Sequence, residues 1–276
     1  MPAPQKEMFC KLAKANFLSM GIKLPMGWAQ PGDQYPGAFD SSELAVAPNT
    51  PTNLFREASL NKYHVDTSKD IGEKFEKFID GICGAISEAI DKWMKMATIA
   101  GVIINGPVGM MLPGNVVGPP LTPLILSKAP KKTPQENRYS NAIATALGTF
   151  WMPWHMGLMG TLMYPSFAAF PGPVAPPTPN IPMPLITFSS PGESGLSPGS
   201  LKGAMMGILG DPKALHASNL FDAITKAFSV VFQTFKASTM VQNVLGTGPI
   251  PTFAPPFVPV GPVLGGTVIP KPGVLT

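Results

Sequence analysis

The chain has 276 residues, and its 20 basic and 16 acidic side chains give a net charge of +4, too small and too scattered to indicate nucleic-acid binding. Hydrophobic residues make up 45% of it and charged residues 13%, which argues against intrinsic disorder, since disordered chains combine low hydrophobicity with high charge. The 34 prolines and 28 glycines indicate much extended backbone that neighbouring segments must cover, because buried N–H and C=O groups need partners.

The charges are unevenly distributed along the chain. Of the 36 charged residues, only 8 follow residue 138. The C-terminal half is therefore nearly uncharged, and a surface of this kind would aggregate if it stood alone in water. We expect other protein subunits to cover it permanently, with a membrane as the less favoured alternative.

Residues 1–68 are predicted to form an N-terminal helix and an extended arm. Met8, Leu12 and Ala15 fall on one face of the helix, and its lysines lie elsewhere. Such a basic amphipathic helix either docks by its apolar face with its lysines in water, or lies on a membrane. Residues 25–53 carry turn signals every few positions, which is typical of an arm that wraps a partner. The N-terminus has no signal-peptide pattern, so we expect synthesis in the cytoplasm.

The strongest helix prediction covers residues 69–105. Its apolar side chains recur at spacings of three and four, the period of an amphipathic helix: Phe75, Phe78, Ile79, Ile82, Ile86, Ile90 and Trp93. A Gly/Pro-rich tail follows and is expected to be extended. The same helix-plus-tail pattern occurs twice more. The chain therefore divides into repeat 1 at 69–127, repeat 2 at 135–190, an insertion at 191–213 and repeat 3 at 214–276.

A fixed register relates the three repeats. Each is anchored on an aromatic residue: Trp93, Trp151 and Phe235. A proline follows fourteen positions later, and another follows six positions further on: Pro107, Pro165 and Pro249, then Pro113, Pro171 and Pro255. No gap is needed, so the register indicates an internal triplication. We expect the aromatic anchors to occupy equivalent places, and the first proline of each pair to mark where a helix gives way to extended chain.

These features predict a mainly α fold with long extended Gly/Pro-rich segments. Because one helix-plus-tail unit cannot bury its apolar stripe alone, the three units are expected to pack on one another. Two arrangements are open, a linear stack and a closed ring with pseudo-threefold symmetry. A ring would suit the symmetry axis of a trimeric or hexameric assembly.

No residue pattern that carries chemistry stands out. Cys10 and Cys83 match no metal or redox spacing and are expected to be small buried hydrophobes. The sequence also lacks the signatures of serine hydrolases, P-loop proteins and zinc proteases, and His155 alone supports no catalytic role. We therefore expect no enzymatic activity, no cofactor, no metal site and no small-molecule substrate. Prolines and polar residues interrupt the apolar stretches at 96–112 and 142–174, which disfavours membrane spanning.

The low charge and the Gly/Pro-rich runs GTGPIPTFAPPFVPVGPVLGG and FPGPVAPPTPNIPMPL resemble the structural proteins of tailed bacteriophages and contractile injection machines. The resemblance lies in the character of residues 69–276 rather than in a motif. It implies a non-enzymatic virion or tail/baseplate component, held in such a particle by extensive contacts with other subunits. The alternative is a membrane-associated protein that uses its basic amphipathic N-terminal helix and its apolar repeats. A third possibility is a scaffold whose proline tails bind partner grooves.

Overall fold

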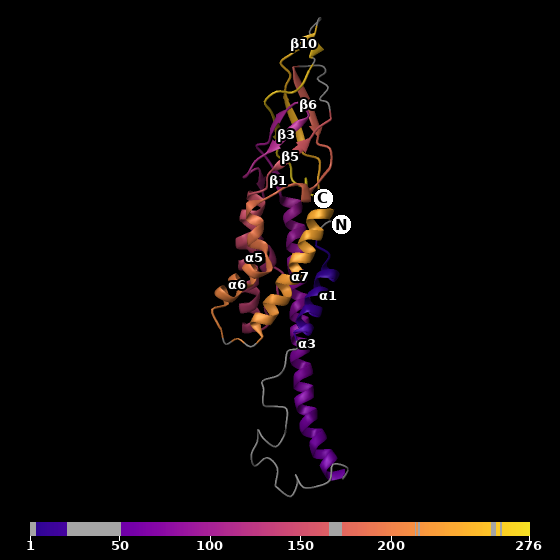
Figure 1. Cartoon of the computed structure of the whole chain (residues 1–276), viewed down its shortest axis with the longest axis vertical. Coiled ribbons are helices and arrows are strands. Elements are labelled where there is room, and N and C mark those ends of the chain that lie inside the picture. The colour runs from indigo at the N-terminus through magenta and orange to yellow at the C-terminus, as the bar shows by residue number, and fades with distance from the viewer. Residues whose placement is uncertain are drawn as a thin grey trace.

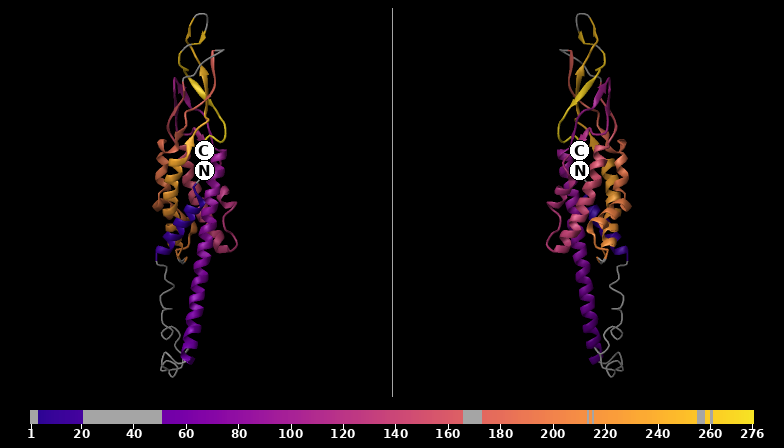
Figure 2. Two further views of the ribbon diagram at one scale, coloured as in Figure 1. Left: turned by 90° about the vertical axis from the view of Figure 1, so that its right-hand side faces the viewer. Right: turned by 90° about the vertical axis from the view of Figure 1, so that its left-hand side faces the viewer.

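The computed structural model shows an elongated molecule with strands at one end and helices at the other (Figure 1). Two further views show the same division, and the N-terminal part of the longest helix projects past the other helices (Figure 2). The structure describes residues 4–20, 51–165, 173–212, 214, 216–254, 258–259 and 261–276.

The described part of the helical end combines long and short helices. The long helices are α3 (Pro51–Met96), α5 (Pro134–Met156) and α7 (Ala217–Ser238). The short helices are α1 (Lys6–Ser19), α4 (Leu121–Leu126) and α6 (Pro198–Leu209). Two 3-10 helices precede α6 in the sequence, η1 (Leu185–Thr187) and η2 (Pro191–Leu196).

Apolar periodicity and local capping explain where helices form. In α3, Ile79, Ile82 and Ile86 recur on one face and are fully buried. Helix α5 begins at a capping box, in which Thr133 and Glu136 each accept a hydrogen bond from the other's backbone N–H.

The bounds of α3 differ from those predicted. Helix α3 contains most of the predicted helix 69–105 but ends at Met96, and it begins at Pro51, so its first turns come from residues assigned to the arm. The arm's residues 21–50 lie outside the described part of the chain. Helix α5 runs through Pro153, which lies in its last turn, before it ends.

The prediction of a mainly α fold with long extended segments is wrong. The protein is mixed, 54% helical and 18% strand, and its Gly/Pro-rich tails form a six-stranded antiparallel sheet among the described residues. The physical reason is that the non-proline residues of an extended tail keep backbone N–H and C=O groups that need partners. The tails find those partners both within themselves, as in β2 with β3, and in one another, as in β3 with β5.

Most strands are short, and together they build the end of the molecule opposite the projecting part of α3 (Figure 1). The six-stranded sheet has the order β5-β3-β2-β12-β9-β6, with antiparallel neighbours throughout. The other described strands pair as β1 with β4, β7 with β8 and β10 with β11. Their bounds are β1 Thr98–Ile99, β2 Ile103–Asn105, β3 Val108–Met111, β4 Val116–Val117, β5 Gly160–Met163, β6 Val174–Pro179, β7 Met183–Pro184, β8 Met240–Val241, β9 Leu245–Pro249, β10 Phe253–Ala254, β11 Val258–Pro259 and β12 Gly266–Ile269.

The described elements fall into three units of one plan, a short helix, a long helix and then strands. The first unit is α1, α3 and β1–β4; the second is α4, α5 and β5–β7; the third is α6, α7 and β8–β12. These units differ from the predicted repeats, because each includes a short helix before its long helix and strands in place of an extended tail.

The helices of the three units pack in a closed cycle. Each short helix contacts the long helix of its own unit and the long helix of the unit before it: α1 packs on α3 and α7, α4 on α5 and α3, and α6 on α7 and α5. The short helices thereby link each pair of long helices.

The strands of the main sheet follow the same cycle. A strand of each unit pairs with a strand of the next: β3 with β5, β6 with β9, and β12 with β2. The two edge strands, β5 and β6, both belong to the second unit. Just beyond β6, the Ile181 N–H donates to the carbonyl of Met163 at the end of β5, at 2.7 Å. The two edges of the sheet therefore approach each other at this point.

A cluster of buried aromatic side chains lies where the long helices end. The rings of Trp93 and Trp151 meet edge to face with centroids 5.1 Å apart, and Trp151 lies 6.2 Å from Phe235. Trp154 and Phe232 complete the cluster, with centroids 5.1 Å apart. Pairs in this geometry stabilise by about 0.5–1.5 kcal/mol beyond the area that they bury. The cluster joins all three units just before their chains enter the sheet.

Replacing Trp151 by alanine should lower the free energy of unfolding by about 3–5 kcal/mol, because it removes the ring that contacts the other two anchors and leaves a cavity. The neighbouring Met152 is 57% exposed, and Met152→Ala should change the free energy by no more than about 0.5 kcal/mol. Urea unfolding followed by circular dichroism measures both. Equal losses in the two variants would contradict the central position of the cluster.

Candidate interaction surface

The outer face of the main sheet is uncharged and carries many apolar side chains, with Asn105, Thr161 and Thr267 among them. Strands β2, β3, β5 and β12 alternate buried and exposed residues, as expected for a sheet with one face inside. The outward face of such a sheet is normally polar. Here its exposed side chains include Ile103, Val108, Met110, Met163 and Ile269, which we call the apolar outer face.

The strand register makes four of these side chains direct neighbours. Ile103 is paired with Met110 across β2 and β3, and Val108 is paired with Met163 across β3 and β5. Directly paired side chains on one face have Cβ atoms about 4.5–5.5 Å apart. Further exposed apolar side chains at the same end of the molecule are Leu112, Val117, Val174, Ile181 and Leu264.

Charged side chains are almost absent from the segments that form this end. Residues 97–120, 157–190 and 239–276 contain a single charged residue, Lys271. The next residue, Pro272, forms a bridge with Thr98, two residues beyond the end of α3. The single charge therefore lies beside the helices, at the base of the sheet end.

Asn180 is the most fully bonded polar side chain of the sheet end. It is buried, and its amide donates to the carbonyls of Ile181 at 2.9 Å and Val241 at 3.0 Å. Its side-chain oxygen accepts from the Val244 N–H at 3.0 Å. It thereby ties the end of β6 to the segment between β8 and β9.

Other polar groups of this end also bond within it. Thr247 donates to the Ala175 carbonyl, and the side-chain oxygen of Asn105 accepts from the Gly265 N–H. Both side chains therefore form hydrogen bonds with the protein's own backbone.

The aromatic anchors and the prolines predicted from the sequence lie in different environments. The aromatic anchors Trp93, Trp151 and Phe235 meet in the buried cluster, near the ends of α3, α5 and α7. The helices end before the predicted prolines, so the prediction that these prolines end the helices is wrong. Instead, a strand precedes each proline or contains it: Pro107 lies in the β2–β3 turn, Pro165 follows β5 and Pro249 ends β9.

The second set of prolines is only partly described. Pro113 lies in the turn between β3 and β4. Pro171 and Pro255 lie outside the described residues. The sequence does not single out the residues of the apolar outer face, because it predicts extended tails without a strand register.

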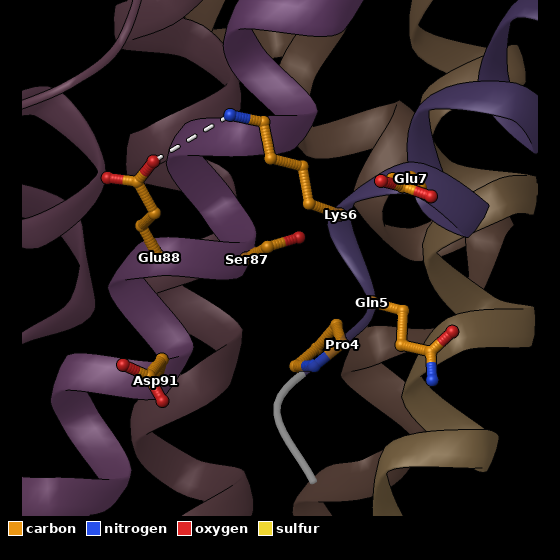
Figure 3. A pocket seen from close by; sticks show the side chains of 7 residues that line it. All are labelled: Pro4, Gln5, Lys6, Glu7, Ser87, Glu88 and Asp91. Atoms are coloured by element: carbon orange, nitrogen blue, oxygen red, sulfur yellow. Dashed lines mark ion pairs between the residues drawn. The ribbon is translucent and has the colours of Figure 1, made fainter. Parts of the chain in front are cut away.

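An open cavity of about 620 Å³ lies beside the N-terminal helix (Figure 3). Pro4, Gln5 and Lys6 face Glu88 and Asp91 of α3 across it. Lys6 forms an ion pair with Glu88 at 3.8 Å, and both side chains are about half exposed. Exposed pairs of this kind contribute little, about 0–1 kcal/mol. The cavity carries both signs of charge, and the hydroxyl of Ser87, which also lines it, donates to the Cys83 carbonyl at 3.0 Å rather than to a carboxylate.

A smaller hollow of about 210 Å³ lies between η2 and α7. Beside it, the buried Lys236 donates to Glu193 at 2.6 Å, and its charge lies 5.7 Å from the centre of the Phe232 ring. Glu193 also accepts from Gln233. These bonds fasten η2 to α7, which is a structural role.

The face of α1 that is buried against α3 and α7 carries Phe9, Ala13 and Phe17. It is not the predicted face, since Met8 and Leu12 are only partly buried and Ala15 is exposed. Cys10 and Cys83 are both buried and free. The hydrogen bond with Cys83 lowers the pKa of Cys10, whereas burial raises the pKa of Cys83.

Burial keeps two titratable side chains neutral where the helices give way to the sheet. Burial lowers the pKa of His155, although the hydrogen bond between its Nδ1 and the Trp151 carbonyl, at 2.9 Å, acts in the opposite direction. Burial also raises the pKa of Tyr164. The ring of Tyr164 fills the inner side of the sheet, where a Cβ added at Gly246 would lie 2.7 Å from it. Only glycine fits there without displacement.

No family model matches the chain, and neither curated proteins nor solved structures give a match. Within the described residues, no three His, Cys, Asp or Glu side chains are grouped so that they could hold a metal ion. Nor is any described helix long and apolar enough to cross a membrane. The surface that stands out is therefore the apolar outer face.

Asn180→Ala should lower the free energy of unfolding by at least about 1–3 kcal/mol, because it leaves a buried N–H and a buried carbonyl without their partner. Asn141→Ala, at an exposed position on α5, should cost no more than about 0.5 kcal/mol. Thermal or urea unfolding compares the two. A loss for Asn180→Ala as small as that of the control would show that this link between β6 and β9 is dispensable.

His155 should make the fold less stable in mild acid. Its pKa in the fold is lowered from an ordinary value of 6.5, so the unfolded chain takes up a proton first. Its contribution to stability is complete above that value and is lost as the pH falls through the lowered pKa. Between about pH 7.5 and about pH 5.5 the unfolding free energy of the wild type should therefore fall more than that of His155→Phe. Parallel falls in the two proteins would contradict this assignment.

Proposed function

We propose that this protein is a non-enzymatic structural component of a large assembly, held by extensive contacts with other protein subunits. The assembly would be the virion of a tailed bacteriophage or a contractile injection machine, with the chain in its tail or baseplate. The resemblance of the weakly charged, Gly/Pro-rich segments to structural proteins of such machines supports this choice. No catalytic residue, cofactor, metal or small-molecule substrate is part of the proposal.

The observation that carries the proposal is the closed cycle of three units. Each short helix packs on the long helix of its own unit and on that of the unit before, and the sheet strands pair in the same order. A ring of three identical subunits presents three equivalent surfaces. One chain with three similar units in a cycle can therefore meet each of those subunits through a similar contact.

The helical end is the part suited to hold the protein in such a ring. Most of the charged side chains belong to this part of the chain. Helix α3 is 46 residues long, and its N-terminal part projects past the other helices (Figures 1 and 2). A helix in a protein draws most of its stability from packing against neighbours. The projecting part therefore provides a surface for partner subunits.

The number of copies of this chain for each copy of its partner subunit tests the proposal. The tagged full chain should be isolated with its partner from cells in which the assembly forms, and the complex weighed by native mass spectrometry. We expect one copy of this chain for every three copies of one partner, or for a multiple of three. A complex with equal copy numbers, or a chain that remains a monodisperse monomer at high concentration in those cells, would overturn it.

A further inference from the structure

The apolar outer face needs a covering that carries no charge. Its strands expose Ile103, Val108 and Met110 where an outward sheet face would ordinarily carry polar side chains. A domain of usual composition has about 25% charged residues, yet Lys271 is the single charge in the segments that build this end. We propose that the apolar outer face binds the hydrocarbon region of a phospholipid bilayer. This inference does not rest on the assembly proposed above.

The first argument for lipid is the distribution of charge along the molecule. Lys271 lies next to the Pro272–Thr98 bridge, close to the helices, and the sheet beyond it carries no charge. Charged side chains are strongly unfavourable in hydrocarbon. The sheet end therefore meets the requirement that a bilayer sets, and the charged helices can remain in water.

The second argument is that several polar side chains at this end hydrogen-bond within the protein. In hydrocarbon, an unpaired polar group is strongly unfavourable. Asn180 makes three hydrogen bonds inside the protein, and Thr247 and Asn105 bond to backbone groups of other strands. Asn180 in particular, which is buried, has partners for its amide and for its oxygen without water.

The third argument concerns the edges of the sheet and favours lipid over a protein that adds a strand. Strand β6 contains Pro176, Pro177 and Pro179, which have no N–H to donate. At the other edge, the carbonyl of Met163 in β5 already accepts from the Ile181 N–H. A protein that docks by strand addition needs a free edge. Here the available surface is the face, whose exposed side chains are apolar or uncharged.

The binding mode differs from that of a basic amphipathic helix. The apolar side of α1 is buried in the bundle, so α1 does not present that surface. A membrane contact through lysines would depend on anionic lipid and would weaken in salt. Contact through the apolar outer face should depend on neither.

Flotation of the full chain with neutral phosphatidylcholine vesicles tests the proposal. We expect the protein to float with the vesicles, with the same bound fraction at about 0.1 M and about 1 M NaCl. Met110 is 55% exposed on the outer face, and Met110→Lys should lower vesicle partitioning at least about tenfold. Ile103→Lys, beside it on β2, provides a second variant with the same expected loss.

The matched control is Val230→Lys on α7. Val230 is 52% exposed, so the control makes the same change of charge at a similarly exposed position on the helical end. It should leave flotation unchanged, and circular dichroism should show that all three variants remain folded. The proposal is overturned if the wild type fails to float with neutral vesicles, or if Val230→Lys loses binding as much as the outer-face variants.

The alternative to lipid is that a second copy of the chain covers the apolar outer face. The same variants distinguish these two possibilities. If copies cover each other's outer faces, the wild type without vesicles will form a concentration-dependent oligomer that Met110→Lys dissociates in analytical ultracentrifugation. That result would also overturn the proposal. The copy number of the partner subunit, measured separately, is unaffected by either outcome, so failure of this inference and failure of the proposed function can be told apart.

Discussion

Strand pairing between successive units is the constraint on which the rest of the structure depends. A unit's strands cannot satisfy their backbone alone, since β5 finds its partner in β3 of the first unit and β9 pairs with β6 of the second. Leaving such groups unpaired and buried would cost about 1–3 kcal/mol each. Pairing therefore brings the three tails into one sheet. It also brings together the helix ends from which the tails start, where Trp93 and Trp151 meet.

The helices could be predicted from the sequence because their signals are local. The stripe through Ile79, Ile82 and Ile86 has the period of a helix and is buried as expected. The strands could not be predicted in this way, because a strand that is apolar on both faces shows no alternation. One local signal was present: Gly106, at a φ of 63°, and Pro107 form the two-residue β2–β3 turn, whose first position favours glycine.

The sequence predicts that this part of the protein is uncharged, but it does not predict which residues form the candidate surface. The lack of charge in the C-terminal half is visible in the sequence. Which apolar residues face outward depends on register with strands distant in the chain, as for Val108 opposite Met163 and Ile103 opposite Thr267. A shift of one residue would exchange the buried and exposed sides. Tyr164, packed against Gly246, helps to fill the inner side and so determines which side is inside.

The closed order of the units has a consequence for how the chain is made on the ribosome. Strand β2 receives its partner β12 only when Gly266 and Thr267 have been synthesised, and Phe9 of α1 packs on Phe228 of α7. Contacts between residues so far apart in the chain slow folding. During translation, the nascent chain exposes an unpaired strand edge and an uncovered first helix until α7 and β12 have emerged. Such an edge invites pairing between neighbouring nascent chains on one messenger RNA. Shielding of β2 until β12 emerges would prevent that pairing.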